Sequence, residues 1–346
     1  MSWKNILLLL SVIALIHGVV IYGCMQSDSD AVDAAAAKAA EELHNRQLSL
    51  FYRLFSAPDD PDVPEQFAVQ KNVEPWKYGE NPTLPPNLLT QSRGAKSVIL
   101  IDLESRRVIF EYNSRNAVPI ASLTKLMSLL IVSEKIKADT SLSMSKMVEL
   151  SSAARSVENA KLKAGKYSIK DLMYSMIVGS FNDAATQLAI TCCGSVPEFV
   201  KEMNQKAAAM GLKNAKFNSP SGLPQDGVNS FASAGEVAML CEAVMKNPDL
   251  AKICSTARYT MENGSKRRGG RDIGSDNRMI NGRNVPGAFG FKTGFTNAAG
   301  RCVAFGVKRN GRTIIGVTTG FGDRNKLFDF SIALTEWAFK NTKVEN

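Results

Sequence analysis

Three short motifs in this chain bring together residue types that can carry out nucleophilic catalysis without a histidine. They are Ser122-Leu-Thr-Lys125, Ser180-Phe-Asn182 and Lys292-Thr-Gly294. The chain contains 2 histidines, His17 and His44, and both precede the region that looks like a folded domain. Neither a Ser-His-Asp triad nor a histidine-ligated zinc is therefore expected there, and no cofactor or metal is predicted. The chemistry left to consider is a serine nucleophile with a lysine as its base.

The first motif places a hydroxyl and an amine on one side of a predicted helix. Ser122 and Lys125 are three residues apart in a helix expected from about residue 121 to 135, so their side chains share a face. Lys125 is the single charged residue among residues 120–132, and a helix that is apolar all round is expected to be buried. Burial favours the neutral amine, which can take a proton from a neighbouring hydroxyl. The backbone N–H of Ser122, near the helix start, can also stabilise an oxyanion.

The second and third motifs are predicted to lie in a loop and in a strand. Ser180-Phe-Asn182 falls between two helix-like segments, residues 171–178 and 183–189, where a loop can present a hydroxyl and an amide to a cleft. A plain helix–helix turn is the alternative. Lys292-Thr-Gly294 sits in a strand-like run, residues 288–296. Its lysine and threonine suit a carboxylate, and its glycine allows a substrate backbone to approach closely. Taken alone, it is also compatible with a surface strand.

Two of the patterns recur elsewhere in the chain. The sequence around each copy therefore has to show which one belongs to a catalytic site. Ser143-Met-Ser-Lys146 repeats the spacing of the first motif in a polar, charged stretch, where a lysine is not expected to lose its proton. Ser275-Asp-Asn277 fits the second pattern, but it lies shortly before Lys292 in a stretch rich in glycine and arginine. We interpret both copies as chance matches.

Strand-like runs at both ends of the domain enclose a mostly helical middle. Two hairpins are predicted, one from residues 97–102 and 107–112 and one from residues 301–308 and 313–319. Asn310-Gly311 joins the second pair and is a strong hairpin signal. Residues 147–260 are mostly helical, and an amphipathic helix is expected at residues 324–340. We therefore predict an α+β fold, with an antiparallel sheet flanked by helices and an inserted helical subdomain.

The chain divides into three predicted parts. Residues 1–24 combine a basic start with an apolar run and indicate a signal peptide or a membrane anchor. The run ends at Cys24 in a sequence similar to a bacterial lipoprotein signal, in which the cysteine is lipidated; an uncleaved anchor is the alternative. Residues 25–92 read as a helical and Pro-rich spacer, and residues 93–346 as the folded domain. We expect an exported protein of the bacterial cell envelope, tethered to the membrane through its N-terminus.

In this order, the motifs and their surroundings resemble the serine D,D-peptidases, the penicillin-binding proteins, and most of all the low-molecular-mass D-alanyl-D-alanine carboxypeptidases. The resemblance runs from about residue 95 to the end of the chain. It rests on the segments Pro119–Met127, Ser180–Ala185, Phe217–Pro224 and Phe291–Gly300. It implies a β-lactamase/D,D-peptidase-like fold and removal of the terminal D-alanine from peptidoglycan stem peptides through an acyl-enzyme on Ser122. It also implies β-lactam antibiotics as covalent inhibitors.

The resemblance further implies a role for each motif residue. The implied catalytic residues are Ser122, the acylated nucleophile, Lys125, its base, and Ser180, which passes the proton to the leaving D-alanine. The implied substrate-binding residues are Asn182 for the amide, Lys292 and Thr293 for the terminal carboxylate, Gly294 for close approach, and Phe295, whose backbone N–H completes the oxyanion hole with that of Ser122. Phe181 stands where the family usually has a small residue, so it is expected to narrow the cleft.

Three alternatives remain open at this point. A D,D-endopeptidase that cuts cross-links would use the same atoms. A class A-like β-lactamase would need a glutamate to activate the deacylating water, and the candidates Glu198, Glu202 and Glu236 lack the expected Glu-x-x-x-Asn loop. A non-catalytic basic envelope protein would use the net charge of +9 and the stretch Lys266–Arg271 to bind an anionic polymer. Nucleic acid is not expected as a partner, because export removes it and no aromatic residues interleave the charges.

Overall fold

The computed structural model describes residues 76–262 and 271–342. Several sequence-based predictions lie outside these residues: the signal or anchor at residues 1–24 with Cys24, the spacer up to residue 75, and most of the basic stretch Lys266–Arg271. No helix within the described ranges combines the length and the apolar character needed to span a bilayer.

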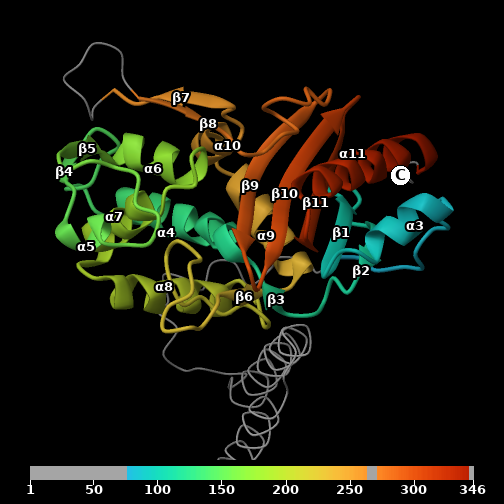
Figure 1. The fold of residues 1–346 in the computed structure, drawn as a ribbon, viewed down its shortest axis with the longest axis horizontal. Coiled ribbons are helices and arrows are strands. Elements are labelled where there is room, and N and C mark those ends of the chain that lie inside the picture. The colour runs from blue at the N-terminus through green and yellow to red at the C-terminus, as the bar shows by residue number, and fades with distance from the viewer. Residues whose placement is uncertain (1–75, 263–270, 343–346) are drawn as a thin grey trace, which may run out of the picture. The chain divides into compact units, whose positions relative to one another are not determined.

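A five-stranded antiparallel sheet forms one half of the domain (Figure 1). Its strands, in spatial order, are β2 (Val108–Tyr112), β1 (Ser97–Asp102), β11 (Arg312–Phe321), β10 (Gly300–Arg309) and β9 (Ala288–Thr296). The first hairpin, β1–β2, is thus joined to the second hairpin, β10–β11, by pairing of β1 with β11. The β10–β11 turn is made by Asn310 and Gly311, both with positive φ, which is the geometry of a tight hairpin turn.

Both faces of the sheet are covered, and β1 shows how the sequence achieves this. Every residue of β1 is buried, and successive side chains of a strand point to opposite faces. Ile99 and Ile101 belong to the core shared with the helical subdomain, whereas Val98 and Leu100 belong to the core on the other face. A continuous β-branched and aliphatic run is therefore the pattern of a strand with a helix layer on each side.

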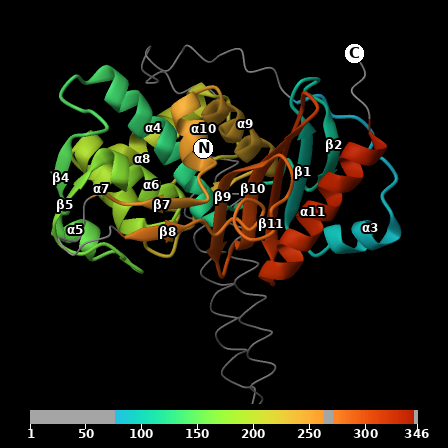
Figure 2. The same cartoon turned by 90° about the horizontal axis from the view of Figure 1, so that it is seen from above.

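Helices form these two layers (Figures 1 and 2). One face carries α11 (Arg324–Asn341) and α3 (Pro86–Ser92), and the other carries α9 (Ala234–Met245) and α10 (Pro248–Cys254). The helical subdomain is inserted between β2 and β9. It contains α4 (Lys125–Ala138), α5 (Ser152–Arg155), α6 (Ile169–Ile177), α7 (Asn182–Cys193) and α8 (Val196–Ala209). Three short strand pairs were not predicted from the sequence. They are β3 (Val118–Pro119) with β6 (Phe231–Ala232), β4 (Met147–Glu149) with β5 (Lys166–Ser168), and β7 (Arg258–Thr260) with β8 (Asp272–Gly274).

The folded part begins earlier than the predicted boundary at residue 93. Trp76 is buried in the core, where its indole N–H donates to the carbonyl of Gly235 (3.0 Å). Leu84 and Leu88 are buried in the core under α11. Residues 76–92 therefore belong to the domain and not to the predicted spacer. The prolines of this stretch indicated a spacer, although its apolar residues are buried.

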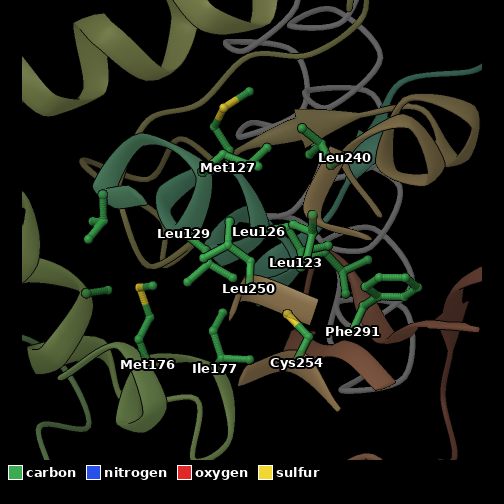
Figure 3. Packing of buried hydrophobic residues seen from close by; sticks show 14 of the residues in the cluster. Leu123, Leu126, Met127, Leu129, Met176, Ile177, Leu240, Leu250, Cys254 and Phe291 are labelled. Carbon is green, nitrogen blue, oxygen red and sulfur yellow. The ribbon is translucent and has the colours of Figure 1, made fainter. Parts of the chain in front are cut away.

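Helix α4 lies at the centre of the larger core. Its residues Lys125–Val132 are all buried, as the apolar sequence predicted. Figure 3 shows side chains of α4 packed against neighbours from several surrounding elements. Those neighbours include Met176 and Ile177 of α6, Leu240 of α9, Leu250 and Cys254 of α10, and Phe291 of β9. This packing excludes water from residues 125–132 of α4, including Lys125 at the N-terminal end of the helix.

Candidate active site

Ser122 and Lys125 meet at the junction of two helices. Ser122 lies in a short 3₁₀ helix, η2 (Ala121–Thr124), and Lys125 is the first residue of α4. Residues three apart eclipse in a 3₁₀ helix, which aligns the two side chains more closely than an α-helix would. Lys125 Nζ lies 2.9 Å from Ser122 Oγ. The predicted pair is therefore assembled within hydrogen-bond distance, in a tighter helical turn than expected.

The Lys125 amine is fully buried and surrounded by three oxygens. Besides Ser122 Oγ, Nζ contacts Asn182 Oδ1 (2.8 Å) and the carbonyl oxygen of Ser221 (2.7 Å). A neutral amine has two N–H groups and one lone pair, so it can donate to Asn182 and Ser221 and accept from the serine hydroxyl. Burial, reinforced by the nearby charges of Lys292 and Lys161, holds the pKa of Lys125 well below its ordinary value. A lowered pKa favours the neutral amine, which is the form that a general base requires.

The backbone around Ser122 is held in an unusual conformation by a neighbouring loop. Ala121 has φ of 46°, in the left-handed region that alanine rarely adopts. Gly222, at φ 80°, lies so close that an added Cβ would be 2.0 Å from the Ala121 carbonyl oxygen. The glycine after Ser221 therefore lets this loop approach Ala121, next to Ser122, and bring the Ser221 carbonyl to Lys125.

We predict that Gly222→Ala destabilises the protein by about 2–4 kcal/mol, because it combines left-handed strain with a backbone clash beside the nucleophile. Thermal unfolding measures the loss. Gly227→Ala is the matched control, since Gly227 has nearly the same φ (77°) but no atom within 4 Å of an added Cβ. It should show the conformational cost alone, about 1–2 kcal/mol. Equal losses in the two variants would contradict the close approach of Gly222 to Ala121.

The second motif forms the turn between α6 and α7. Ser180 has φ of 55°, and the following residue, Phe181, donates its backbone N–H to the Ser175 carbonyl (3.0 Å). Asn182 begins α7, and its amide is used twice within the protein: Oδ1 accepts from Lys125, and Nδ2 donates to the Glu158 carbonyl (3.1 Å). Asn182 therefore orients the lysine in this structure.

The third motif lies on β9, the strand at the end of the sheet next to η2. Lys292 is 2% exposed, and its Nζ donates to the Thr293 carbonyl (2.8 Å). Burial lowers the pKa of Lys292 to about 8, although the negative charge of Asp276 acts to raise it. Gly294 has a packing role within the protein. A Cβ there would lie 3.0 Å from the backbone nitrogen of Ser122, so the glycine lets β9 pack against the segment that carries Ser122.

A cavity of about 230 Å³ joins the three motifs. Six of the eight predicted site residues line it: Ser122, Ser180, Asn182, Thr293, Gly294 and Phe295. The side chains of Lys125 and Lys292 are buried behind its wall. Phe295 is half exposed at the cavity, and the Arg301 guanidinium lies 4.5 Å from the centre of its ring. The structure thus brings together residues separated by up to 173 positions, as Ser122 and Phe295 are.

Sequence reasoning missed several charged and polar residues of the cavity. They are Asn159, Lys161, Asp276, Arg301 and Arg324. Asp276 lies within the Ser-Asp-Asn triplet that was set aside, and it forms an ion pair with Arg324 (2.7 Å). That triplet does not form the turn between α6 and α7, yet through Asp276 it borders the cavity. No spacing rule could have shown this, because the contact depends on how β8, β9 and α11 pack.

The structure separates the competing candidates from the cavity. Ser143, of the second Ser-x-x-Lys copy, is exposed and contacts Ser145 Oγ (3.2 Å). Of the glutamates considered for a β-lactamase, Glu202 pairs with Lys135 (2.6 Å), Glu236 caps the start of α9, and Glu198 is exposed on α8. None of these three lines the cavity.

Phe181 does not narrow the cavity, contrary to expectation. Its side chain is 4% exposed and is absent from the cavity lining. The ring instead covers Gly179, where an added Cβ would lie 2.5 Å from it. The larger residue is accommodated beneath the turn, because Gly179 leaves room for it.

An α+β domain with a partly buried serine beside a buried lysine, between its sheet and its helical subdomain, has the architecture of the penicillin-binding serine peptidases. The chain belongs to the D-alanyl-D-alanine carboxypeptidase family, peptidase family S11, whose sequence model matches residues 86–322. This family was the one that the three motifs indicated.

Individual relatives agree with this assignment. D-alanyl-D-alanine carboxypeptidase DacF of Bacillus subtilis is 32% identical over 70% of this chain, which spans 63% of that protein's length. A D-alanyl-D-alanine endopeptidase of Pseudomonas aeruginosa is 30% identical over 62% of the chain and 67% of its own length. Penicillin-binding protein D2 of Listeria monocytogenes, solved in a cefotaxime-bound form, superposes with a TM-score of 0.65 at 27% identity, covering 75% of this chain and all of that one. The predicted D,D-peptidase-like fold is thereby confirmed.

Proposed function

We propose that this protein is a serine-type D,D-carboxypeptidase that removes the terminal D-alanine from peptidoglycan stem peptides. The observation that carries the proposal is the Lys125 amine, sealed from water and 2.9 Å from Ser122 Oγ at the wall of the cavity. The family and the curated relatives supply the substrate class. The cavity suits it, because the basic side chains of Lys161, Arg301 and Arg324 line it against the single carboxylate of Asp276 and would attract a terminal carboxylate.

The proposed reaction has two halves. Lys125 takes the proton of Ser122, whose oxygen bonds to the carbonyl carbon of the penultimate D-alanine, and the backbone N–H groups of Ser122 and Phe295 stabilise the oxyanion. The C–N bond then breaks while Ser180 relays the proton to the departing amine. A water molecule next hydrolyses the ester, which releases the shortened peptide and restores the serine.

Two of the substrate-binding roles need adjustment to fit the geometry. Asn182 already gives its carbonyl to Lys125 and its amide to Glu158, so we assign it to positioning the base before any contact with the substrate amide. Lys292 is buried, so we assign direct carboxylate contact to Thr293 and an electrostatic contribution to Lys292.

The same site would react with β-lactam antibiotics, because their strained amide presents a carbonyl and a carboxylate in the same arrangement. The Listeria relative was solved with cefotaxime bound, which supports this proposal. The substrate also places the protein in the bacterial cell envelope. Membrane tethering through a lipidated Cys24 or an uncleaved anchor remains part of this proposal.

Mass spectrometry of a peptide ending in D-Ala-D-Ala tests the proposal. We expect wild-type protein to release one D-alanine and then stop, because the product lacks the second D-alanine. A peptide ending in L-Ala-L-Ala should remain intact. Cleavage of a cross-linked peptide dimer, with the linear peptide left intact, would instead favour the endopeptidase, which relatives bearing that name make the second candidate. If neither peptide is cleaved, the proposed function is wrong.

A further inference from the structure

Lys161 is a cation at the cavity that none of the three motifs includes. It lines the cavity with Ser122 and Asn182, on the loop between α5 and β5. We infer that Lys161 is a positioning residue for acylation: its ammonium group, fixed beside the site, keeps the Lys125 amine in the neutral form that accepts the serine proton. The inference rests on the proposed function and deepens it.

The backbone of Lys161 is attached to the start of α7. The buried carboxylate of Asp183 accepts the backbone N–H groups of both Lys161 and Leu162 through Oδ2. The preceding residue, Asn182, binds the Glu158 carbonyl and the Lys125 amine. Two consecutive residues of α7 thus hold the base and the Lys161 loop in one fixed arrangement.

The side chain of Lys161 is held as well. Its ammonium donates to the Gly179 carbonyl (3.4 Å) and lies 5.0 Å from the centre of the Phe181 ring. On the same ring, the Arg271 guanidinium lies at 4.8 Å, and Arg271 also donates to the Lys161 carbonyl. A cation over an aromatic face is attracted to it, so Phe181 fixes Lys161 where a small residue could not. This gives a reason for the unusual phenylalanine in the second motif.

The charged groups acting on Lys125 come from three directions. Lys292 on β9 and Lys161 on its loop both disfavour the ammonium form, whereas Asp183 on α7 favours it. The charge of Lys161 also lowers the pKa of Lys292. Lys125 and Lys292 are buried and cannot be changed without loss of the site, but Lys161 is exposed. Lys161 is therefore the member of this set whose charge can be removed while the fold is retained.

The test is the pH dependence of the acylation rate constant with a fluorescent penicillin, measured for full-length wild type and three variants. Lys161→Met removes the charge and keeps the unbranched stem, and Lys161→Arg keeps a charge. Lys163→Met is the matched control, because it removes an exposed lysine from the same loop outside the cavity lining. Acylation should need neutral Lys125 and protonated Lys292, which gives a bell-shaped profile.

Loss of the Lys161 charge should raise the pKa of both Lys125 and Lys292. The whole pH profile of the acylation rate constant should therefore move to higher pH. We expect a shift of about half to one pH unit in Lys161→Met, and no shift in Lys161→Arg or Lys163→Met. High salt should move the wild-type profile towards that of Lys161→Met, since salt screens an exposed charge.

A Lys161→Met profile that is lower at every pH but unshifted would refute the inference and leave the proposed function standing, because a purely structural defect scales the rate without moving its midpoints. An equal shift in Lys163→Met would also refute it, since net charge alone would then be the cause. Wild-type protein that is unlabelled at every pH would refute the proposed function and this inference together.

Discussion

Replacing Ser122 with alanine should abolish covalent labelling by penicillin and release of D-alanine. The oxygen that forms the acyl bond is then absent, and loss of a nucleophile typically lowers turnover by about 10⁶-fold. Ser122 is only partly buried and makes one side-chain hydrogen bond in the described structure, to Lys125. The fold should therefore survive, with unfolding free energy changed by about 1 kcal/mol or less. Intact-protein mass spectrometry after incubation with penicillin gives the measurement.

Ser143→Ala is the matched control, because Ser143 occupies the same place in the other Ser-x-x-Lys sequence. Its hydroxyl is exposed and lies outside the cavity lining. We expect full labelling of this variant. Labelling that survives in Ser122→Ala but is lost in Ser143→Ala would overturn the assignment of the site. Labelling of neither variant nor wild type would favour the basic, non-catalytic envelope protein.

The contact between Ser122 and Lys125 could be predicted because its signal is local. Ser122 and Lys125 are close in sequence, and their apolar surroundings are visible as a run of aliphatic residues, so both contact and burial follow from one helix. The sheet was predictable for a similar reason: each strand has its own alternating or continuous apolar pattern, and Asn310-Gly311 specifies one turn. The order of strands required the resemblance or the structure.

The rest of the site depends on long-range packing, which no short pattern records. Gly222 is needed because its loop approaches Ala121, about one hundred positions away in the chain. Lys161 and Arg271 meet over Phe181, and the sequence shows only an unusually large residue at that position. Phe181 was expected to point into the cleft, because its neighbours in the motif do. The space left by Gly179 directs the ring the other way.

The hydrogen bonds of Asn182 could not be predicted from the motif that contains it. The sequence suggests an amide that is free for the substrate, since asparagine is polar and lies in a loop. In the structure, both ends of that amide have partners, and one partner is the Lys125 amine. Hydrogen-bond capacity is limited, so a group that is already satisfied contributes to orientation first.

Replacing Lys125 with arginine should abolish acylation although the positive charge is retained. A guanidinium does not lose its proton at working pH, so it cannot accept the proton of Ser122. Loss of general-base catalysis typically costs about 10²–10⁴-fold in rate. The second-order labelling rate constant with fluorescent penicillin, followed from pH 6 to pH 10, measures the loss. High pH should not restore activity to the arginine variant.

Arginine is also larger than the lysine that it replaces at this fully buried position, so a folding defect has to be separated from a chemical one. Lys125→Met serves this purpose, because methionine fills much of the same volume without charge. It leaves Asn182 Oδ1 and the Ser221 carbonyl without the lysine donor, at a cost of about 1–3 kcal/mol, while avoiding the burial of a charge. Thermal unfolding should therefore show Lys125→Met to be more stable than Lys125→Arg, with both variants unlabelled. An arginine variant labelled within tenfold of the wild-type rate would show that another group removes the serine proton, and the neutral-amine mechanism would have to be abandoned.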